Sequence, residues 1–594
     1  MKLLLVILSL GPWWTNSAFA ASAQCLKYSK IVHSGTEAKK LTSLLDTHWK
    51  YYMTEYPEWA TFIGFPGQDD RWTDSSLAAI ERRRSENICL RDTIAKIKRA
   101  GLPVGERVNY DLALRNATMA VEGDKFDQDY MPISHMDGFH LDVTQVLTAM
   151  PPTVKGYENM LTRLERYPAL AEQIANIMRE GVKRKAMPVK AFMPRISGQL
   201  VELTPAKVED SPFYQVFKEM SPSLVAADKV RLQNRAKDII TTQIYPAVAK
   251  FKEFFEKDYA PNGRESIAWA DMPNGKAWYA YNVKRHTTTN MTPEQLHEMG
   301  LKEVATITAE MQKVIEQVKF KGDRQAFNKF LLKDKQFYYT TKQDLLSGYR
   351  DIAKRLDPEL PKLFKTLPRL TYGVREIQEF QAKSAAGAQY VGGSSETGRA
   401  GFFEANTFDL PSRPKWEMET LTIHEAVPGH HFQIAIAQEL KNLPEFRKYG
   451  HFTSFVEGWA HYAETLGKDM GFFKDPHSYY GHLSGQMLRS VRLVVDTGMH
   501  AKGWSKQKAW DYYRSQMPTS DVDSENEINR YITWPGQALA YKVGHLKFRE
   551  LREKSKLALG EKFNIREFHD EVLRHGALPL DVLEKTVDAW TAKN

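Results

Sequence analysis

The segment Leu421–Gln433, "LTIHEAVPGHHFQ", decides how this chain is interpreted. A His-Glu pair with a second His four residues after the first is typical of zinc peptidases, because one helical turn aligns both imidazoles beside a glutamate that activates water. Here Pro428 stands four residues after His424, and the next histidines are His430 and His431. The motif therefore departs from the ordinary spacing of this class.

A regular helix would keep these histidines too far apart for one metal ion. Six residues advance an α-helix by about 9 Å and turn His430 away, and seven place His431 on the right side but about 10.5 Å along. Ligands of one zinc ion lie within about 2.1 Å of it. Pro428 cannot donate a hydrogen bond to the carbonyl of His424, and Gly429 tolerates unusual dihedral angles. We therefore expect a widened turn that brings His430 beside His424, and His431 stays open as the alternative ligand.

A third ligand is expected on a helix over residues 452–467, "FTSFVEGWAHYAETLG". Glu457 lies there among apolar and aromatic residues, where a bare carboxylate is costly to bury and a cation would stabilise it. An ion pair with an arginine is the alternative. Two histidines and one glutamate with an open fourth position form a catalytic zinc set. We predict one zinc ion per chain on His424, His430 and Glu457, with Glu464 as the next choice for the third ligand, and cobalt or manganese as other possible occupants.

Most of the remaining chain has the periodicity of helices. Apolar residues recur at helical spacing over 38–52, 75–100, 157–185 and 226–259. Thr292, Pro293 and Gln295 start a further helix that runs to about residue 318. Residues 387–410 are instead rich in glycine and aromatic residues, which predicts a pair of strands with a glycine turn. The predicted fold class is mainly α, with a small β-hairpin or sheet next to the metal helix.

Composition excludes several function classes. Of the 594 residues, 42% are hydrophobic and 26% are charged, which argues against a disordered, a collagen-like or a polytopic membrane protein. The net charge of +9 is small for this length, and no basic tract with interleaved aromatic residues occurs. We therefore expect no nucleic-acid partner.

The N-terminus predicts export. A charged start, an apolar run over residues 3–10 and the sequence Ala18-Phe19-Ala20 predict a signal peptide, residues 1–20, with cleavage after Ala23 as the alternative. The mature protein is then periplasmic or secreted, with no membrane insertion. Export permits a disulfide between Cys25 and Cys89, which the sequence leaves open. We divide the mature chain into an N-terminal helical lobe, 21–280, and a catalytic helical lobe, 281–594.

Four motifs together resemble the DUF885 family, a group of bacterial zincin-like metallopeptidases. They are "HEAVPGHHFQ" (424–433), "FVEGWAHYAE" (455–464), "RLVVDTGMH" (492–500) and "RYITWPGQALAYKVG" (530–544), and the match extends to residue 584. The resemblance implies a large two-lobed helical zincin-like fold with a central channel, similar to the thimet oligopeptidase and carboxypeptidase Taq groups.

The resemblance also implies roles for individual residues. His424, His430 and Glu457 carry over as metal ligands and Glu425 as the general base. His431 would then lie next to the ligands or face the substrate. A second electrophile would stabilise the oxyanion, and Tyr541 is favoured for it over His500.

Three further residues are candidates for substrate binding. Arg530 and Tyr531 precede a Pro-Gly turn and could bind a peptide carboxylate. Asn406 lies in the segment "GRAGFFEANTFDL", residues 398–410, which in similar enzymes forms an edge strand that pairs with the substrate backbone. A structural hairpin is the alternative for that segment.

The sequence thus predicts an exported zinc metallopeptidase that hydrolyses short peptides, of the oligopeptidase or carboxypeptidase type, with Glu425 as general base. Two alternatives stay open: an amidase or carboxypeptidase acting on cell-wall peptides, and a metal-free or non-catalytic peptide-binding protein. A serine hydrolase is disfavoured, since "GGSSETG" is not a nucleophile elbow. Peptide length, side-chain preference, endo- or exopeptidase action, oligomeric state and physiological role are left open.

Overall fold

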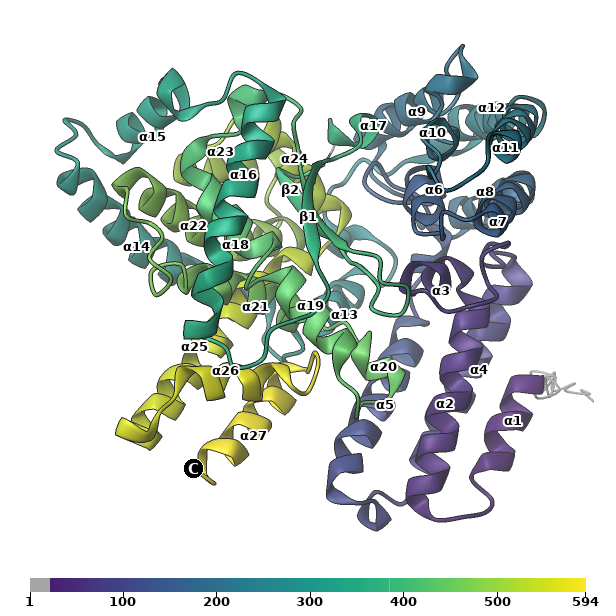
Figure 1. Cartoon of the computed structure of the whole chain (residues 1–594), viewed down its shortest axis with the longest axis horizontal. Coiled ribbons are helices and arrows are strands. Elements are labelled where there is room, and N and C mark those ends of the chain that lie inside the picture. Colours follow the sequence, from purple (N-terminus) through teal and green to yellow (C-terminus); the bar gives the residue numbers. More distant parts are fainter. Residues whose placement is uncertain (1–21, 384) are drawn as a thin grey trace, which may run out of the picture.

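The computed structural model describes residues 22–594 apart from residue 384 (Figure 1). The protein is mainly helical with one small sheet. The first half of the chain forms α1 (Ala23–Ile31), α2 (Glu37–Glu55), α3 (Pro57–Ile63), α4 (Leu77–Ala95), α5 (Val104–Gly123), α6 (Phe139–Thr148), α7 (Val154–Glu165), α8 (Tyr167–Arg184), α9 (Met193–Glu202), α10 (Gln215–Lys218), α11 (Ala226–Ile239) and α12 (Tyr245–Phe254).

The second half carries the longest helices and the sheet. Its helices are α13 (Gly275–Thr287), α14 (Pro293–Gln317), α15 (Arg324–Lys333), α16 (Lys342–Leu356), α17 (Glu379–Ala382), α18 (Met418–Glu425), α19 (His430–Glu439), α20 (Glu445–Lys448), α21 (Thr453–Thr465), α22 (Pro476–Ala501), α23 (Lys506–Gln516), α24 (Asp521–Thr533), α25 (Ala540–Leu559), α26 (Ile565–Leu573) and α27 (Leu580–Thr591).

Local sequence signals set most helix boundaries. The helix predicted from Thr292 is confirmed as α14, with Thr292 and Gln295 forming a reciprocal capping box. The run predicted over 157–185 is two helices instead of one. It breaks at Arg166 because Pro168 cannot donate a helical hydrogen bond and its ring excludes the preceding turn. The run over 226–259 continues through two wide turns, at 240–244 and 255–259.

Two glycines let the helices of the second half approach closely. α21 packs along α25, and α14 along α22. A Cβ atom on Gly458 of α21 would lie 2.5 Å from the Cα of Gly544 in α25, and one on Gly544 would lie 1.9 Å from the carbonyl oxygen of Ser454. Any larger residue would push the helices apart. This contact fixes where α21 and α25 present their polar residues.

The sheet contains β1 (Tyr372–Glu376), β2 (Ala388–Val391) and β3 (Gly401–Ala405), in the order β1-β3-β2. The hairpin predicted over 387–410 is confirmed, since β2 pairs antiparallel with β3. β1 was not predicted, and it pairs parallel with β3 on the other side. The expectation that the segment containing β3 is an edge strand is therefore wrong, because both sides of β3 are already paired.

The two halves lie on opposite sides of the molecule (Figure 1). Apolar side chains of α4 and α6–α12 form one core, and those of α13, α16, α18, α19, α21, α25 and the sheet form another. Residue 280, the predicted boundary, falls inside α13, and Trp278, Tyr279 and Val283 of α13 pack into the second core. The boundary at residue 280 stays a prediction, although a division there would cut through α13. The division into two lobes itself stays a prediction.

The predicted signal peptide, residues 1–20, lies outside the described residues. None of the described helices combines the length and the apolar character needed to cross a membrane. Cys25 on α1 and Cys89 on α4 are unbonded, on two helices that pack against each other.

Candidate metal centre

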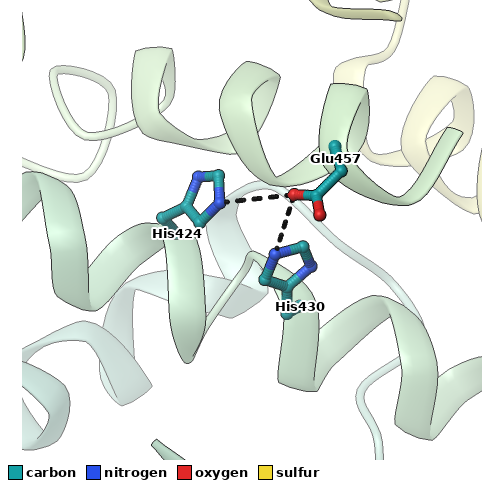
Figure 2. A group of neighbouring side chains, drawn as sticks. All are labelled: His424, His430 and Glu457. Atoms are coloured by element: carbon teal, nitrogen blue, oxygen red, sulfur yellow. Dashed lines mark ion pairs between the residues drawn. The ribbon is translucent and has the colours of Figure 1, made fainter. Parts of the chain in front are cut away.

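His424, His430 and Glu457 converge from three helices (Figure 2). The Nε2 atom of His424 lies 3.7 Å from Oε2 of Glu457, and the Nε2 atom of His430 lies 3.3 Å from the same oxygen. These distances are long for hydrogen bonds, which cluster near 2.9 Å. Tetrahedral ligands bonded to one zinc ion at 2.0–2.1 Å are about 3.3 Å apart. The spacing of these three atoms therefore suits a shared cation better than direct bonding.

The chain meets the unusual histidine spacing by stopping one helix and starting another. α18 ends at Glu425 and α19 begins at His430. The widened turn expected within one helix is therefore wrong, and a non-helical link with a cis Val427–Pro428 bond replaces it. His430 becomes the first residue of a new helix, so its direction is independent of the helical phase of α18.

Tertiary contacts hold this link in place. The indole Nε1 of Trp459 on α21 donates a hydrogen bond to the Pro428 carbonyl, 2.8 Å away. Gly429 is required beside it, because a Cβ atom there would lie 2.0 Å from the carbonyl oxygen of His424. Helix α21, which carries Glu457, therefore stabilises the link between α18 and α19.

The carboxylate of Glu457 has an unsatisfied oxygen. Among the described residues, its buried Oε2 atom has no hydrogen-bond partner, and neither does Nδ1 of His430. A buried charge without a partner is costly, and a cation between the three side chains would remove that cost. The two-His, one-Glu donor set suits zinc, and cobalt or manganese would also accept it. The three residues therefore form a candidate metal site.

Glu464 lies behind His424 instead of in the metal site. Its Oε1 atom is 2.8 Å from Nδ1 of His424, on the opposite side of the imidazole from Glu457, and 3.2 Å from Nη2 of Arg489. Burial alone would lower the pKa of His424, but the neighbouring carboxylates of Glu457 and Glu464 outweigh that effect and raise it to about 9. A carboxylate in this position fixes the ring orientation of a metal-binding histidine. Glu464 is therefore a positioning residue, and the fallback assignment of Glu464 as third ligand has no geometric support.

A cavity of about 530 Å³ opens onto the candidate metal site. Glu425 lines it together with His424, His430 and Glu457. The first half of the chain contributes His135, Met136, Leu141, Asp142, Gln145 and Gln199 to its wall. The cavity thus lies between the two halves, with the metal site in the wall of the second.

Tyr541 is placed next to the candidate metal site. Its ring centroid lies 6.3 Å from that of His424, and it lines the cavity. The Tyr541 hydroxyl accepts a hydrogen bond from Nη2 of Arg530 at 2.7 Å. A hydroxyl held in this way is fixed in direction, as a hydrogen-bond donor to substrate must be. Arg530 therefore has a role through Tyr541 in addition to lining the cavity.

Two histidines predicted at the site are bonded elsewhere. Each ring nitrogen of His500 pairs with backbone, Nδ1 with the Trp269 amide at 3.3 Å and Nε2 with the Tyr531 carbonyl at 2.9 Å. His431 is bonded to the Tyr390 hydroxyl and the Leu370 carbonyl. Neither lines the cavity. The structure therefore does not support His500 as an electrophile or His431 as a substrate contact, because both side chains are committed to the fold.

Asn406 and Tyr531 are likewise engaged within the fold. The Asn406 amide donates to three backbone carbonyls, the nearest that of Ala382 at 2.7 Å, and its oxygen accepts from the Phe408 amide. The Tyr531 hydroxyl contacts Glu527 and Arg492. Neither side chain lines the cavity, so neither is positioned to contact a substrate there.

Several cavity residues were missed by sequence reasoning. The strand that faces the cavity is β2, through Ala388, Gln389 and Tyr390. Arg489 and Arg492 also line it, from the middle of the buried helix α22. A weak signal exists for the arginines, since two charged residues in a long apolar helix are unusual.

Comparison with known proteins identifies the family. Residues 57–587 match the profile described as "Bacterial protein of unknown function (DUF885)". The chain belongs to the DUF885 family. No curated protein matches it.

Two solved structures are similar to the DUF885 chain. The "putative lipoprotein" of Colwellia psychrerythraea has 28% identity and a TM-score of 0.88, covering 94% of this chain and 100% of its own. A "putative lipoprotein of unknown function" of Shewanella oneidensis has 17% identity and a TM-score of 0.67, covering 93% of this chain and 99% of its own. The first shows that the fold is shared over nearly the whole of both chains, and the second also shows the fold alone.

Proposed function

We propose that this DUF885 protein is a zinc-dependent metallopeptidase that hydrolyses short peptides. The observation that carries the proposal is the placement of Glu425. It directly follows His424 in sequence, and it lines the same cavity as the three candidate ligands. A carboxylate beside an open-sided two-His, one-Glu set is the arrangement that hydrolysis of an amide bond needs.

Each residue of the site has its own role in the proposed hydrolysis. When bound, a zinc ion in such a site supplies Lewis acidity toward the scissile carbonyl and an acidified water. Glu425 takes the proton of the attacking water and passes it to the leaving amine. The Tyr541 hydroxyl, held by Arg530, donates a hydrogen bond to the developing oxyanion.

The size and the wall of the cavity favour peptides over folded proteins. A volume of about 530 Å³ between two helical halves admits a few residues of extended chain. The β2 edge at residues 388–390 can pair with a substrate backbone, because only the β3 side of this strand is occupied within the sheet. Backbone pairing gives affinity with little selectivity for side chains. These features also support the similarity to the thimet oligopeptidase and carboxypeptidase Taq groups.

The proposed site of action is the cell envelope. The predicted signal peptide implies export, and the two similar proteins are described as lipoproteins. Cell-wall peptides are therefore an alternative substrate class within the same chemistry.

The decisive experiment measures metal content and turnover together. The mature protein, purified without chelators or added metal, is expected to hold close to one zinc per chain by plasma mass spectrometry. Glu425→Gln should keep that zinc but lose at least about a hundredfold of the turnover of a peptide library. Glu298→Gln is the matched control, since Glu298 follows His297 in a second His-Glu pair but is exposed on α14.

Two outcomes would contradict the proposal. Full turnover in Glu425→Gln would remove the general-base assignment. A protein that neither contains zinc nor binds it on titration would favour the metal-free peptide-binding alternative.

A further inference from the structure

Three arginines surround Tyr541 at one side of the cavity. Arg489 and Arg492 come from α22 and Arg530 from α24. Their guanidinium carbons lie 5.8, 4.5 and 5.7 Å from the centre of the Tyr541 ring. All three line the cavity that opens onto the metal site. We call these three side chains the arginine cluster.

The arginine cluster has more positive than negative charge. Its ion-pair partners among the described residues are Glu464, which faces Arg489, and Glu527, which faces both Arg492 and Arg530. Three guanidinium groups thus face two carboxylates. Burial alone would raise the pKa of Glu527, but the guanidinium groups of Arg492 and Arg530 lower it to about 2. Glu527 is therefore ionised, and its charge is one of the two negative charges that face the three guanidinium groups.

The metal site does not supply the missing negative charge. A divalent cation held by Glu457 beside Glu425 is balanced by those two carboxylates. The other arginine in the cavity wall, Arg413, has its own partner in Asp523 at 3.1 Å. Glu417 and Asp142 also line the cavity, but burial raises the pKa of Glu417 to about 8 and that of Asp142 to about 7, and neither forms an ion pair with the arginine cluster. One positive charge in the arginine cluster therefore has no ion-pair partner among the described residues.

Hydrogen bonding shows the same deficit. Nε of Arg489, Nη1 of Arg492 and Nε of Arg530 have no acceptor in the described part of the chain. Arg492 is only 4% exposed, so bulk water does not substitute for that acceptor. Buried nitrogens of Arg163, Arg447 and Arg552 also lack an acceptor, so the deficit points to an anion only in combination with the unbalanced charge of the arginine cluster. A bound anion would supply the missing negative charge beside the arginine cluster, which lines the cavity.

Guanidinium groups match carboxylates in shape and charge, since two parallel N–H donors meet two oxygens. In a cavity that takes peptides, the carboxylate common to every substrate is the C-terminal one. We propose that the arginine cluster, chiefly Arg492 and Arg530, binds the C-terminal carboxylate of a short peptide and so directs cleavage to a bond near that end. This inference rests on the proposed peptidase function.

The experiment tests binding separately from cleavage. The zinc-loaded Glu425→Gln protein is titrated with three fluorescent peptides. Two share one sequence and end in a free carboxylate or in an amide. The third is the same sequence with an amidated glutamate at its C-terminus, which offers a carboxylate only on the side chain. The free acid is expected to bind at least roughly tenfold tighter than the amide, since a charge-assisted bidentate contact is lost. Equal affinity of acid and amide would overturn the proposal. Rescue by the glutamate side chain would overturn the C-terminal assignment, because the cluster would then read any carboxylate.

Arginine variants show which side chain causes the preference for the free acid over the amide. Arg492→Gln should reduce the acid-to-amide ratio to near one, and Arg492→Gln with Glu527→Gln provides a second version that leaves no carboxylate unpaired. Arg413→Gln is the control in the same cavity wall, and its ratio should stay unchanged because Asp523 already neutralises Arg413. Metal content, which is independent of turnover, shows that each variant retains the site. An unchanged ratio in both Arg492 variants would contradict the assignment.

The two proposals fail in different ways. If the unsubstituted protein cleaves acids and amides with equal kcat/KM, the peptidase function holds and the carboxylate subsite is wrong. If it cleaves no peptide while Glu425→Gln still prefers the free acid, the subsite holds and the peptidase function is wrong.

Discussion

Two sets of buried polar residues in the second half differ in one respect. His430, Glu457 and Arg492 each leave a buried polar atom without a partner among the described residues. The side chains of His431 and His500, by contrast, have both ring nitrogens bonded within the protein. Because an unpaired buried polar group is costly, the first set calls for a ligand, whereas the second set stabilises the fold.

Adjacent residues in the sequence can also belong to different sets. His430 and His431 are adjacent in sequence and both are buried. His430 points toward Glu457 (Figure 2), whereas His431 is bonded to Tyr390 and to the Leu370 carbonyl. Residue type and burial therefore do not distinguish a ligand from a structural residue here. The hydrogen-bond partners do, and substitutions in the two sets should have different consequences.

The largest expected effect is at Glu457. Glu457→Ala should release the metal and abolish turnover, because two histidines alone leave the ion short of a ligand. Plasma mass spectrometry after dialysis measures the first effect and peptide hydrolysis the second. Glu439→Gln, at the C-terminal end of α19 beside Arg369 and away from the cavity, is the control. One metal ion per chain in Glu457→Ala, with unchanged affinity, would place the third ligand elsewhere.

Tyr541 should be important for rate and not for metal binding. Tyr541→Phe removes one hydroxyl and is expected to lower kcat by about 10²–10³, as loss of an oxyanion donor does, with metal content unchanged. Steady-state kinetics and metal analysis on the same preparation check both statements. A kcat within twofold of the unsubstituted protein would assign the hydroxyl to structure, as for Tyr531.

Glu464 should have an intermediate effect, because it acts through His424. Glu464→Gln is expected to weaken zinc affinity by about 10–100-fold while keeping a folded protein. Competition with a chelator of known affinity measures the change. The free acid-to-amide preference of the cavity should be retained, since Arg492 and Arg530 keep Glu527. Unchanged zinc affinity would show that the His424 ring is oriented by the helix alone.

The smallest functional effect is expected at His500, in the fully bonded set. His500→Ala leaves the Trp269 amide and the Tyr531 carbonyl without partners, which lowers the melting temperature by roughly 1 °C per kcal/mol lost in a chain of this length. Metal content and kcat/KM at a temperature below melting should stay within about twofold. A large loss of kcat in a protein of normal stability would return His500 to the catalytic residues.

The sequence predicted what depends on local spacing. Helical periodicity and the Thr292 capping box predicted α14, and the glycine-rich texture of 387–410 predicted the β2–β3 hairpin. The motif around His424 and the helix of Glu457 named the three side chains that the structure brings together. These features could be predicted because each depends on residues within one or two turns of the chain.

Tertiary structure decided the rest. Whether His500 faces a cavity or a backbone carbonyl depends on α24, and whether β3 is an edge depends on β1, which begins 29 positions before it. The arginine cluster exists only where α22, α24 and α25 meet. The sequence by itself determined which residues are able to bind a metal ion or a carboxylate. Only the packing of distant helices decided which of them keep a polar atom free to do so, because hydrogen-bond partners are assigned by the fold.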